Sequence, residues 1–485
     1  MSLFVHSRRF VSALLLALSA GAVTALAAAP ATSPDSQPAT VRLDYIHSGN
    51  ALNEQYAVER VVIEPLPWPG DMRRTIDDTN RGNNLVEVVD AASGKLLYSR
   101  GFSTVFAEWA STEEAGKTNR GFQESVRFPK PDKPVKVRIL KRDERGAFSV
   151  VWTTSVDTDA MDVVRKQAPT PAKPIGIRVN GPSKDKVDLL ILGDGYTAGE
   201  MKKFEATARR LADHLFNTSP FKERAKDFNV WALALPTQES GVSRPSTGVH
   251  HASPLGTRYD IFGSERYVLT TDNRALRELA QNAPYEFIEI LVNNDTYGGG
   301  GIFGQFSTAA ANNDWANYLF VHEFGHHFAG LADEYYTSPV AYATGGATRP
   351  EPWEPNATAL HDPANVKWKK FVKEGTPLPT PWKKDDYEAA SRAYQKERVA
   401  LRKADRPESE MSALFHKDLQ HTNELFSRDP NRHVVGAFEG ANYEAKGYYR
   451  PEMQCIMFDR SDKFCSVCAD GISTIVDLYS RPKSE

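Results

Sequence analysis

The sequence has 485 residues, with 59 lysines and arginines against 62 aspartates and glutamates, which gives a net charge of −3. A chain of this length can bury a core in two or three domains without a disulfide scaffold. Nucleic acid is not an expected partner, because the near-neutral balance leaves no basic stripe for phosphate contacts.

The first residues have the pattern of an export signal. Arg8 and Arg9 precede an apolar run over residues 11–26, and small residues follow as far as Ala29. We therefore predict a signal peptide over residues 1–29 and a secreted or periplasmic bacterial protein. No later apolar stretch reaches about 18 residues, so we expect no membrane span.

Short segments with alternating apolar and polar residues follow, which is typical of strands with one buried face. Turn signals that end at Gly94 and Gly146 suit antiparallel hairpins. The pattern predicts an antiparallel β-sandwich domain over residues 30–165. The expected strands lie within residues 39–46, 56–66, 83–100, 135–142 and 148–156.

A proline-rich stretch separates this domain from the rest. Residues 166–180 begin with KQAPTPAKPI, in which few side chains can pack, so we predict a linker there. Beyond it, apolar strands alternate with amphipathic helices. This alternation predicts a second domain over residues 181–485, of α/β (α+β) class with a mainly parallel sheet. The expected elements lie at residues 187–197, 200–216, 228–235, 275–283 and 287–294.

The segment WANYLFVHEFGHHFA carries the clearest chemical signal. It is compatible with a helix, and the polar residues 312–314 before it are a natural N-cap. His322 and His326 lie four residues apart on one helix face, from which both can bind one Zn²⁺. Glu323 follows the first histidine and is placed to accept a proton from a metal-activated water.

A catalytic zinc site needs a third protein ligand besides an open position for water. In the metzincin pattern, a glycine turn soon after the second histidine brings that ligand in. Here Gly330 comes one residue later than the pattern requires, and Ala332 stands at the third-histidine position. Asp333 follows directly and is our choice for the third ligand, with Glu334 as its nearest competitor.

Four segments together resemble the bacterial IgA-peptidase family of zinc endopeptidases, metallopeptidase family sixty-four. They are HEFGHHFAGLADEYY, LILGDGYTAGE, GAFEGANYEAKGYYRPEMQCIM and FCSVC, and they span most of residues 187–478. The resemblance implies a metzincin-like zinc metallopeptidase domain behind a β-rich N-terminal domain. It implies one catalytic Zn²⁺ and a protein or peptide substrate, and Met457 looks like the methionine turn that lies beneath the zinc in such peptidases. IgA itself is not implied as the substrate.

The three cysteines, Cys455, Cys465 and Cys468, all lie near the C-terminal end. In an oxidising compartment two of them can pair, and which two is left open. We expect a local disulfide rather than a second metal site, because no other Cys/His pair of suitable spacing lies nearby.

These features predict a monomeric zinc metalloendopeptidase, a hydrolase in which Glu323 is the general base. A polar group should also stabilise the oxyanion that develops on the scissile carbonyl. The candidates by residue type are Tyr335, Tyr336, Tyr443, Tyr449 and His327.

The glycine-rich residues 295–310 precede the zinc motif. They form either a strand that binds peptide by strand addition or a flexible loop.

Two alternative functions would also involve a bound zinc ion. One is a secreted glycan- or protein-binding protein in which zinc serves structure only, and the other is a zinc amidase that acts on cell-wall peptides. An intact Glu323 argues against the first, because a structural site needs no proton acceptor.

Overall fold

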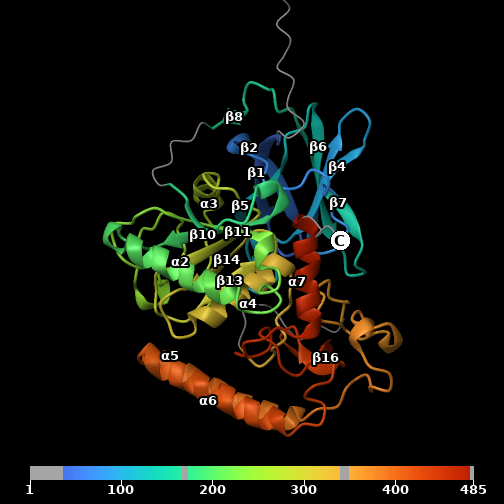
Figure 1. Ribbon diagram of the computed structural model, residues 1–485, viewed down its shortest axis with the longest axis vertical. Helices are drawn as coiled ribbons and strands as arrows, with labels where there is room; N and C mark the ends of the chain where they lie inside the picture. Colours follow the sequence, from blue (N-terminus) through green and yellow to red (C-terminus); the bar gives the residue numbers. More distant parts are fainter. Residues whose placement is uncertain (1–36, 167–172, 339–348, 481–485) are drawn as a thin grey trace, which may run out of the picture. The chain divides into compact units, whose positions relative to one another are not determined.

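The computed structural model describes residues 37–166, 173–338 and 349–480. The expected signal peptide over residues 1–29 lies outside the described residues, as does part of the expected linker. Among the described helices, none is both long and apolar enough to cross a membrane. The fold is mixed α/β with several sheets, and an N-terminal domain precedes a larger domain (Figure 1).

Two four-stranded sheets form the N-terminal domain. The first has the strand order β5-β1-β2-β8, and the second has the order β4-β3-β6-β7. All neighbours pair antiparallel except β2 and β8, which are parallel. The strands are β1 (Ala39–Gly49), β2 (Glu54–Pro67), β3 (Asn84–Asp90), β4 (Leu96–Phe102), β5 (Arg120–Pro129), β6 (Val135–Arg142), β7 (Phe148–Val156) and β8 (Val164–Arg165).

Both sheets contribute to one apolar core. Alternate residues of β1, such as Leu43 and Tyr45, share it with Val137 and Ile139 of β6, as expected for strands with one buried face. The predicted hairpin turn at Gly94 is present, and the positive φ of +72° at this residue explains the glycine. Strand β5 was not predicted from the sequence.

A six-stranded sheet organises the larger domain, in the order β13-β14-β12-β10-β11-β9. The four inner strands are parallel, and both edge strands are antiparallel to their neighbours. Edge strand β9 lies inside residues 166–180, which we had assigned to a linker. The strands are β9 (Ile175–Arg178), β10 (Val187–Asp194), β11 (Phe228–Ala234), β12 (Phe287–Val292), β13 (Gly299–Ile302) and β14 (Phe306–Ala310).

Helices cover both faces of this sheet. On one face, β10 residues Leu189 and Ile191 share a core with α2 (Met201–Leu215), α4 (Ala316–Ala329) and α7 (Ser466–Tyr479). On the other face, Leu190 and Leu192 share a core with α3 (Asn273–Ala280). That second core also includes Phe106 and Trp109 of α1 (Val105–Ala110), which belongs to the N-terminal domain. The two domains are therefore joined by common apolar packing.

Buried arginines of the N-terminal domain add polar contacts to this packing. Arg81 donates through Nη1 to the carbonyl of Ala329 at 2.7 Å and to that of Gly471 at 2.9 Å. These carbonyls lie at the end of α4 and within α7. Arg42 donates to the carbonyl of Arg277 in α3 at 3.3 Å. The end of the zinc-motif helix is thus held by a side chain from the other domain.

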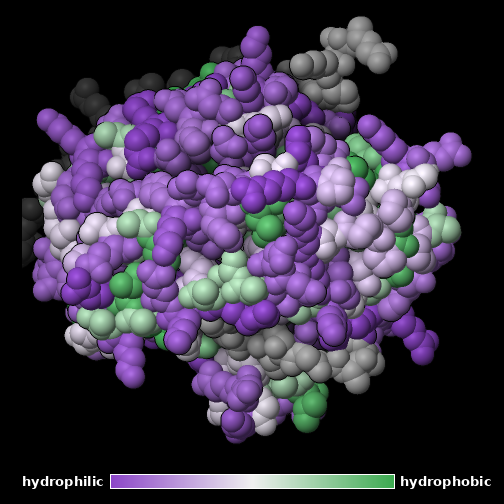
Figure 2. Space-filling view, turned by 90° about the horizontal axis from the view of Figure 1, so that it is seen from below, coloured by the Kyte–Doolittle hydropathy of each residue, from purple (hydrophilic) through white to green (hydrophobic). Residues whose placement is uncertain are grey.

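The C-terminal part contains several elements that were not predicted. Helices α5 (Lys384–Lys403) and α6 (Glu408–Ser427) run side by side, and β15 (Phe438–Ala441) pairs with β16 (Glu444–Arg450). Helix α5 buries a stripe at Tyr387, Ser391, Tyr394 and Arg398. The surface on the side of α5 and α6 is mainly hydrophilic, with apolar residues in small separate groups (Figure 2).

Candidate metal centre

The zinc-motif helix α4 ends where the sequence predicts, but its start differs. Trp315 is the N-cap residue and makes no side-chain cap. Within the polar residues 312–314, Asn313 instead accepts a hydrogen bond from the Trp315 amide at 2.8 Å, just before the helix begins. At the other end, Gly330 has a φ of +59°, and a Cβ there would lie 2.5 Å from the Trp353 ring. The chain turns sharply at this glycine and returns toward the helix.

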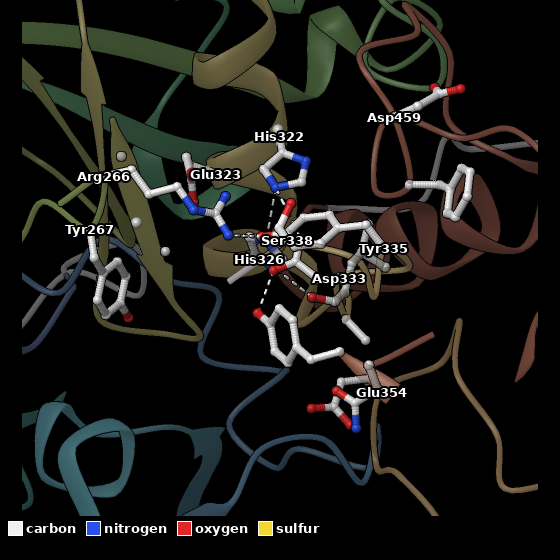
Figure 3. A pocket seen from close by; sticks show the side chains of 18 of the residues that line it. Arg266, Tyr267, His322, Glu323, His326, Asp333, Tyr335, Ser338, Glu354 and Asp459 are labelled. Carbon is white, nitrogen blue, oxygen red and sulfur yellow. Dashed lines mark hydrogen bonds and ion pairs between the residues drawn. The ribbon is translucent and has the colours of Figure 1, made fainter. Parts of the chain in front are cut away.

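Three side-chain atoms converge beside α4 (Figure 3). The Nε2 atoms of His322 and His326 are 3.2 Å apart, and the Oδ1 atom of Asp333 lies 3.1 Å from the first and 3.3 Å from the second. A tetrahedral Zn²⁺ with bonds of about 2.0–2.1 Å holds its ligand atoms about 3.3–3.4 Å apart. This donor set therefore fits one zinc ion.

The hydrogen bonds around the two histidines fix their tautomers. His322 donates through Nδ1 to the carbonyl of Ile456 at 2.9 Å, and His326 donates through Nδ1 to the carbonyl of Leu331 at 2.6 Å. Both Nε2 atoms then face the centre with lone pairs, as metal-bound histidines do. Buried Asp333 Oδ1 has no hydrogen-bond partner among the described residues. Three lone-pair atoms in such close contact repel one another unless a cation lies between them.

The structure separates the two competing carboxylates. Asp333 faces the histidines, and the Tyr443 hydroxyl donates to its second oxygen, Oδ2. Glu334 points the other way, where it accepts from Asn356 Nδ2 at 2.9 Å. The backbone holds this arrangement, because the amide of Glu334 donates to the carbonyl of Met457 at 2.8 Å. Of the two, only Asp333 is in reach of the histidine pair.

The hairpin turn that carries Tyr443 is also tied to this segment. Asn442 and Tyr443, between β15 and β16, have φ values of +52° and +63°. Such a left-handed pair matches a tight hairpin turn, although it is costly for a tyrosine. The Asn442 amide donates to the Asp333 carbonyl at 2.9 Å, which keeps the Tyr443 hydroxyl against the carboxylate.

Buried Met457 lies beneath the helix. Its Sδ atom is 3.1 Å from the position that a Cβ on Gly325 would occupy. The preceding residue, Ile456, supplies the carbonyl that accepts from His322. Gly325 therefore allows this turn to pack directly under the two histidines.

Glu323 is half-buried in the cavity wall beside the two histidines. Burial raises the pKa of its carboxyl, and the neighbouring His322 and His326 partly offset this rise. The glycines of β13 make room for it, since a Cβ on Gly299 would lie 2.9 Å from the Glu323 Cγ atom. A carboxyl with a raised pKa beside a candidate metal centre suits proton transfer.

A cavity of about 500 Å³ opens over these side chains. Arg266, which sequence reasoning missed, lines it and donates through Nη2 to the Tyr335 hydroxyl at 3.1 Å (Figure 3). No local pattern distinguishes this arginine, because it lies in an irregular segment far from the motif. The N-terminal domain supplies further wall residues, among them Ser103 and Glu108.

The candidates for oxyanion stabilisation divide into two groups. Tyr335 and Tyr443 line the cavity, whereas Tyr336 and Tyr449 do not. His327 is fully buried against the sheet, with its Nδ1 atom 3.0 Å from the Ile302 carbonyl and its Nε2 atom accepting from the Ile288 amide at 3.1 Å. Both of its ring nitrogens are occupied, so His327 is a structural residue.

The glycine-rich segment forms strand β13 rather than a flexible loop. Its outer edge is covered in part. The Gly299 amide donates to the Arg266 carbonyl at 3.1 Å, and the Val268 amide donates to the Gly299 carbonyl at the same distance. A peptide cannot pair with β13 at Gly299 because residues 266–268 already do.

The expected disulfide is not formed. All three cysteines are buried free thiols, and the Sγ atoms of Cys455 and Cys468 are 3.7 Å apart. Instead of facing only each other, the thiols surround the carboxylate of Glu334, with Cys468 Sγ at 3.3 Å and Cys465 Sγ at 3.9 Å from its Oε1 atom. The prediction of a disulfide was wrong because the sequence does not show that a carboxylate enters the cluster.

Two family profiles match the chain. The one described as IgA Peptidase M64 covers residues 175–476, and the one described as Peptidase M64 N-terminus covers residues 34–153. Among curated proteins, no significant match to the chain was found. The resemblance inferred from the sequence segments is confirmed by the two profiles. The chain belongs to the IgA Peptidase M64 family, a family of metal-dependent peptidases.

Proposed function

We propose that the protein is a secreted zinc-dependent endopeptidase. The observation that carries this proposal is the triangle of His322 Nε2, His326 Nε2 and Asp333 Oδ1, in which each separation is between 3.1 and 3.3 Å. Two imidazoles and one carboxylate are a ligand set that suits Zn²⁺ and leaves a fourth position open. Membership of a peptidase family makes the peptide bond the expected target.

A bound Zn²⁺ supplies Lewis acidity, which activates water and polarises the scissile carbonyl. Glu323 accepts the proton of the attacking water and delivers it to the leaving amine. Its raised pKa favours this double role, because the carboxyl can hold the proton between the two steps. Arg266 and Tyr335 present a guanidinium and a hydroxyl to the same cavity, where they are suited to stabilise negative charge on the substrate.

The geometry around the centre supports a metzincin-like catalytic domain. The helix turns at Gly330, the next segment brings in Asp333, and Met457 packs beneath the helix at Gly325. In the N-terminal domain, two four-stranded sheets with a common core support the β-sandwich assignment. Secretion is supported by the export-signal pattern of residues 1–29.

The test is hydrolysis of a mixture of unfolded proteins by the chain without residues 1–29. Wild type, chelator-treated wild type and Glu323→Ala are compared, and the zinc content of each is measured. We expect cleavage by wild type only, with restoration when zinc is returned after chelation. Glu323→Ala should hold as much zinc as wild type and lose at least about a hundredfold in rate, the usual effect of losing an acid–base group.

Two outcomes would overturn the proposal. If wild type holds zinc but cleaves no protein or peptide, the metal serves structure and the chain is a binding protein. If wild type cleaves cell-wall peptides but no protein, the enzyme is an amidase. If Glu323→Ala keeps activity close to that of wild type, Glu323 is not the general base, and the rest of the proposal stands.

A further inference from the structure

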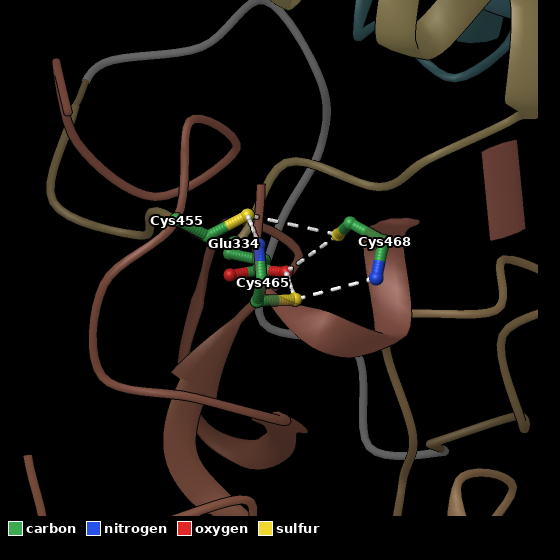
Figure 4. Close-up of side chains that lie close together, drawn as sticks. All are labelled: Glu334, Cys455, Cys465 and Cys468. Atoms are coloured by element: carbon green, nitrogen blue, oxygen red, sulfur yellow. Dashed lines mark hydrogen bonds between the residues drawn. The ribbon is translucent and has the colours of Figure 1, made fainter. Parts of the chain in front are cut away.

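A second cluster of groups that could hold a metal ion shares no residue with the histidine triangle, and Figure 4 shows its side chains. It consists of Glu334, Cys455, Cys465 and Cys468, all of them buried, with one ligand atom from each within 4.8 Å of the others. Three segments contribute. Glu334 follows α4, Cys455 lies in the turn before Met457, and the other two cysteines lie at the start of α7.

The separations match a tetrahedral zinc site. A four-coordinate Zn²⁺ with Zn–S bonds of about 2.3 Å and Zn–O bonds of about 2.0–2.2 Å places sulfur atoms about 3.8 Å apart and a sulfur about 3.5 Å from the oxygen. The observed Sγ–Sγ distance between Cys455 and Cys468 is 3.7 Å. The distances to Glu334 Oε1 are 3.3 Å from Cys468 Sγ and 3.9 Å from Cys465 Sγ.

We propose that Glu334, Cys455, Cys465 and Cys468 bind a second, structural Zn²⁺. Four protein ligands fill the tetrahedron and leave no position for water, which distinguishes a structural site from a catalytic one. The neighbouring carboxylates Asp333 and Glu334 then serve two different ions, since Asp333 faces His322 whereas Glu334 faces Asn356.

Backbone amides donate to two of the three sulfur atoms. The Cys465 amide donates to Cys455 Sγ at 3.2 Å, and the Cys468 amide donates to Cys465 Sγ at 3.3 Å. Cys465 is the N-cap of α7, a helix of 14 residues whose positive end faces the cluster. On zinc binding the three thiols release their protons to solvent, and the site carries a net charge of about −2, the same as a four-cysteine site.

A disulfide explains the cluster less well. It requires an S–S bond of about 2.05 Å and consumes only two of the three thiols. The Oε2 atom of Glu334 is buried and has no hydrogen-bond partner among the described residues. With a disulfide between Cys455 and Cys468, Glu334 would keep only Asn356 and the charge of buried Arg450 as partners, and the thiol of Cys465 would be left unused beside it.

The second ion would fix the segments that position the ligands of the proposed catalytic centre. The Cys455 turn supplies the Ile456 carbonyl that orients His322, and Glu334 directly follows the ligand Asp333. Fixing Glu334 and Cys455 to one ion therefore fixes the position of a catalytic ligand relative to the helix. We expect loss of the second ion to lower the zinc affinity of the histidine–aspartate centre by about 10–100-fold, which is the usual effect of disturbing groups that orient metal ligands.

Metal analysis of the purified mature chain tests this directly. We expect two zinc ions per wild-type chain, one in His322→Ala and at most one in Cys465→Ser. Glu334→Gln keeps all three sulfurs and should lose the second ion with less disturbance of folding. Glu452→Gln is the matched control, since Glu452 accepts from the Ser466 amide at 2.7 Å in the same region but is not a ligand, and it should keep both ions.

Cobalt substitution gives a readout that is independent of activity. Thiolate ligands to Co²⁺ produce strong near-ultraviolet charge-transfer absorption, and the histidine–aspartate centre contains no sulfur. The absorption should persist in His322→Ala and be lost in Glu334→Gln. In the native protein, a thiol reagent should react with none of the three cysteines before chelation and with all three after it.

The result that overturns the second site is one zinc per wild-type chain that Cys465→Ser retains and His322→Ala loses. A disulfide found by mass spectrometry in freshly purified, active protein would also overturn it. The opposite pattern, one zinc that depends on the cysteines and not on His322, would refute the proposed catalytic centre and leave the second site standing. The two proposals can therefore fail separately.

Discussion

Replacement of Gly301 by alanine tests the close contact between strand β13 and helix α4, which carries His322 and His326. A Cβ at this position would lie 2.5 Å from the Glu323 carbonyl oxygen and 2.8 Å from the His326 Cβ atom, and real Cβ contacts essentially never fall below 3.0 Å. The strand and the helix must therefore separate by about half an ångström. Both contacts are with backbone or near-backbone atoms, which cannot rotate away.

The expected cost is about 1–3 kcal/mol of unfolding free energy, as for other overpacked interiors. In a chain of this size that lowers the melting temperature by a few degrees. The displacement acts on Glu323 and His326 together, so kcat/KM should fall by about tenfold or more. Thermal unfolding and peptide hydrolysis are measured on the same preparation.

Gly121→Ala is the matched control. Gly121 also lies in a strand, but a Cβ there would approach only Ile46 and Ser48, each at 3.6 Å. This variant should keep wild-type activity and gain up to about 1 kcal/mol, because alanine restricts the unfolded chain. If Gly301→Ala behaves like Gly121→Ala, the strand and the helix are not in the tight contact on which this reasoning depends.

Three further variants test other contacts. Tyr443→Phe removes the hydroxyl that donates to Asp333 and should weaken zinc binding by about 10–100-fold, measured by competition with a chelator. Arg81→Met removes the guanidinium that donates to the carbonyls of Ala329 and Gly471 and should lower the free energy of unfolding by about 1–3 kcal/mol, whereas an unchanged melting temperature would contradict this. Burial raises the pKa of Glu289 well above its usual range, so the folded state holds a proton that the unfolded state releases above about pH 4.5. As the pH rises above about 4.5, wild type therefore loses about 1.4 kcal/mol of unfolding free energy per pH unit until the folded-state carboxyl also ionises. Glu289→Gln has no such loss. The melting temperature of Glu289→Gln relative to wild type should rise as the pH is raised above about 5, and a constant difference would refute the neutral buried carboxyl.

Local patterns were enough to predict most strands and the zinc-motif helix. The strands at residues 135–142 and 148–156 are observed with those bounds, because alternation of buried and exposed residues is a property of the strand itself. The four-residue spacing of His322 and His326 likewise follows from helix geometry alone.

Features that depend on distant parts of the chain were not predictable. Arg266 reaches the cavity only because residues 266–268 pair with β13, and Glu334 meets the cysteines only because its amide binds the Met457 carbonyl. The N-cap was misplaced because Asn313 bonds to the Trp315 amide instead of to the first helical turn. Helices α5 and α6 were missed. The buried stripe of α5 has helical spacing, but two of its residues, Ser391 and Arg398, are polar, so it does not stand out as an apolar pattern.

The apolar core shared by the two domains has a consequence for how this peptidase can be activated and altered. Many proteases are released by cutting away an N-terminal segment, but removal here would strip Phe106 and Trp109 from Leu190 and Leu192 and leave that sheet face open to water. We therefore expect the N-terminal domain to remain attached in the active enzyme. Because Glu108 also lines the cavity, mutations in a domain that carries none of the chemistry can change which substrates are cut.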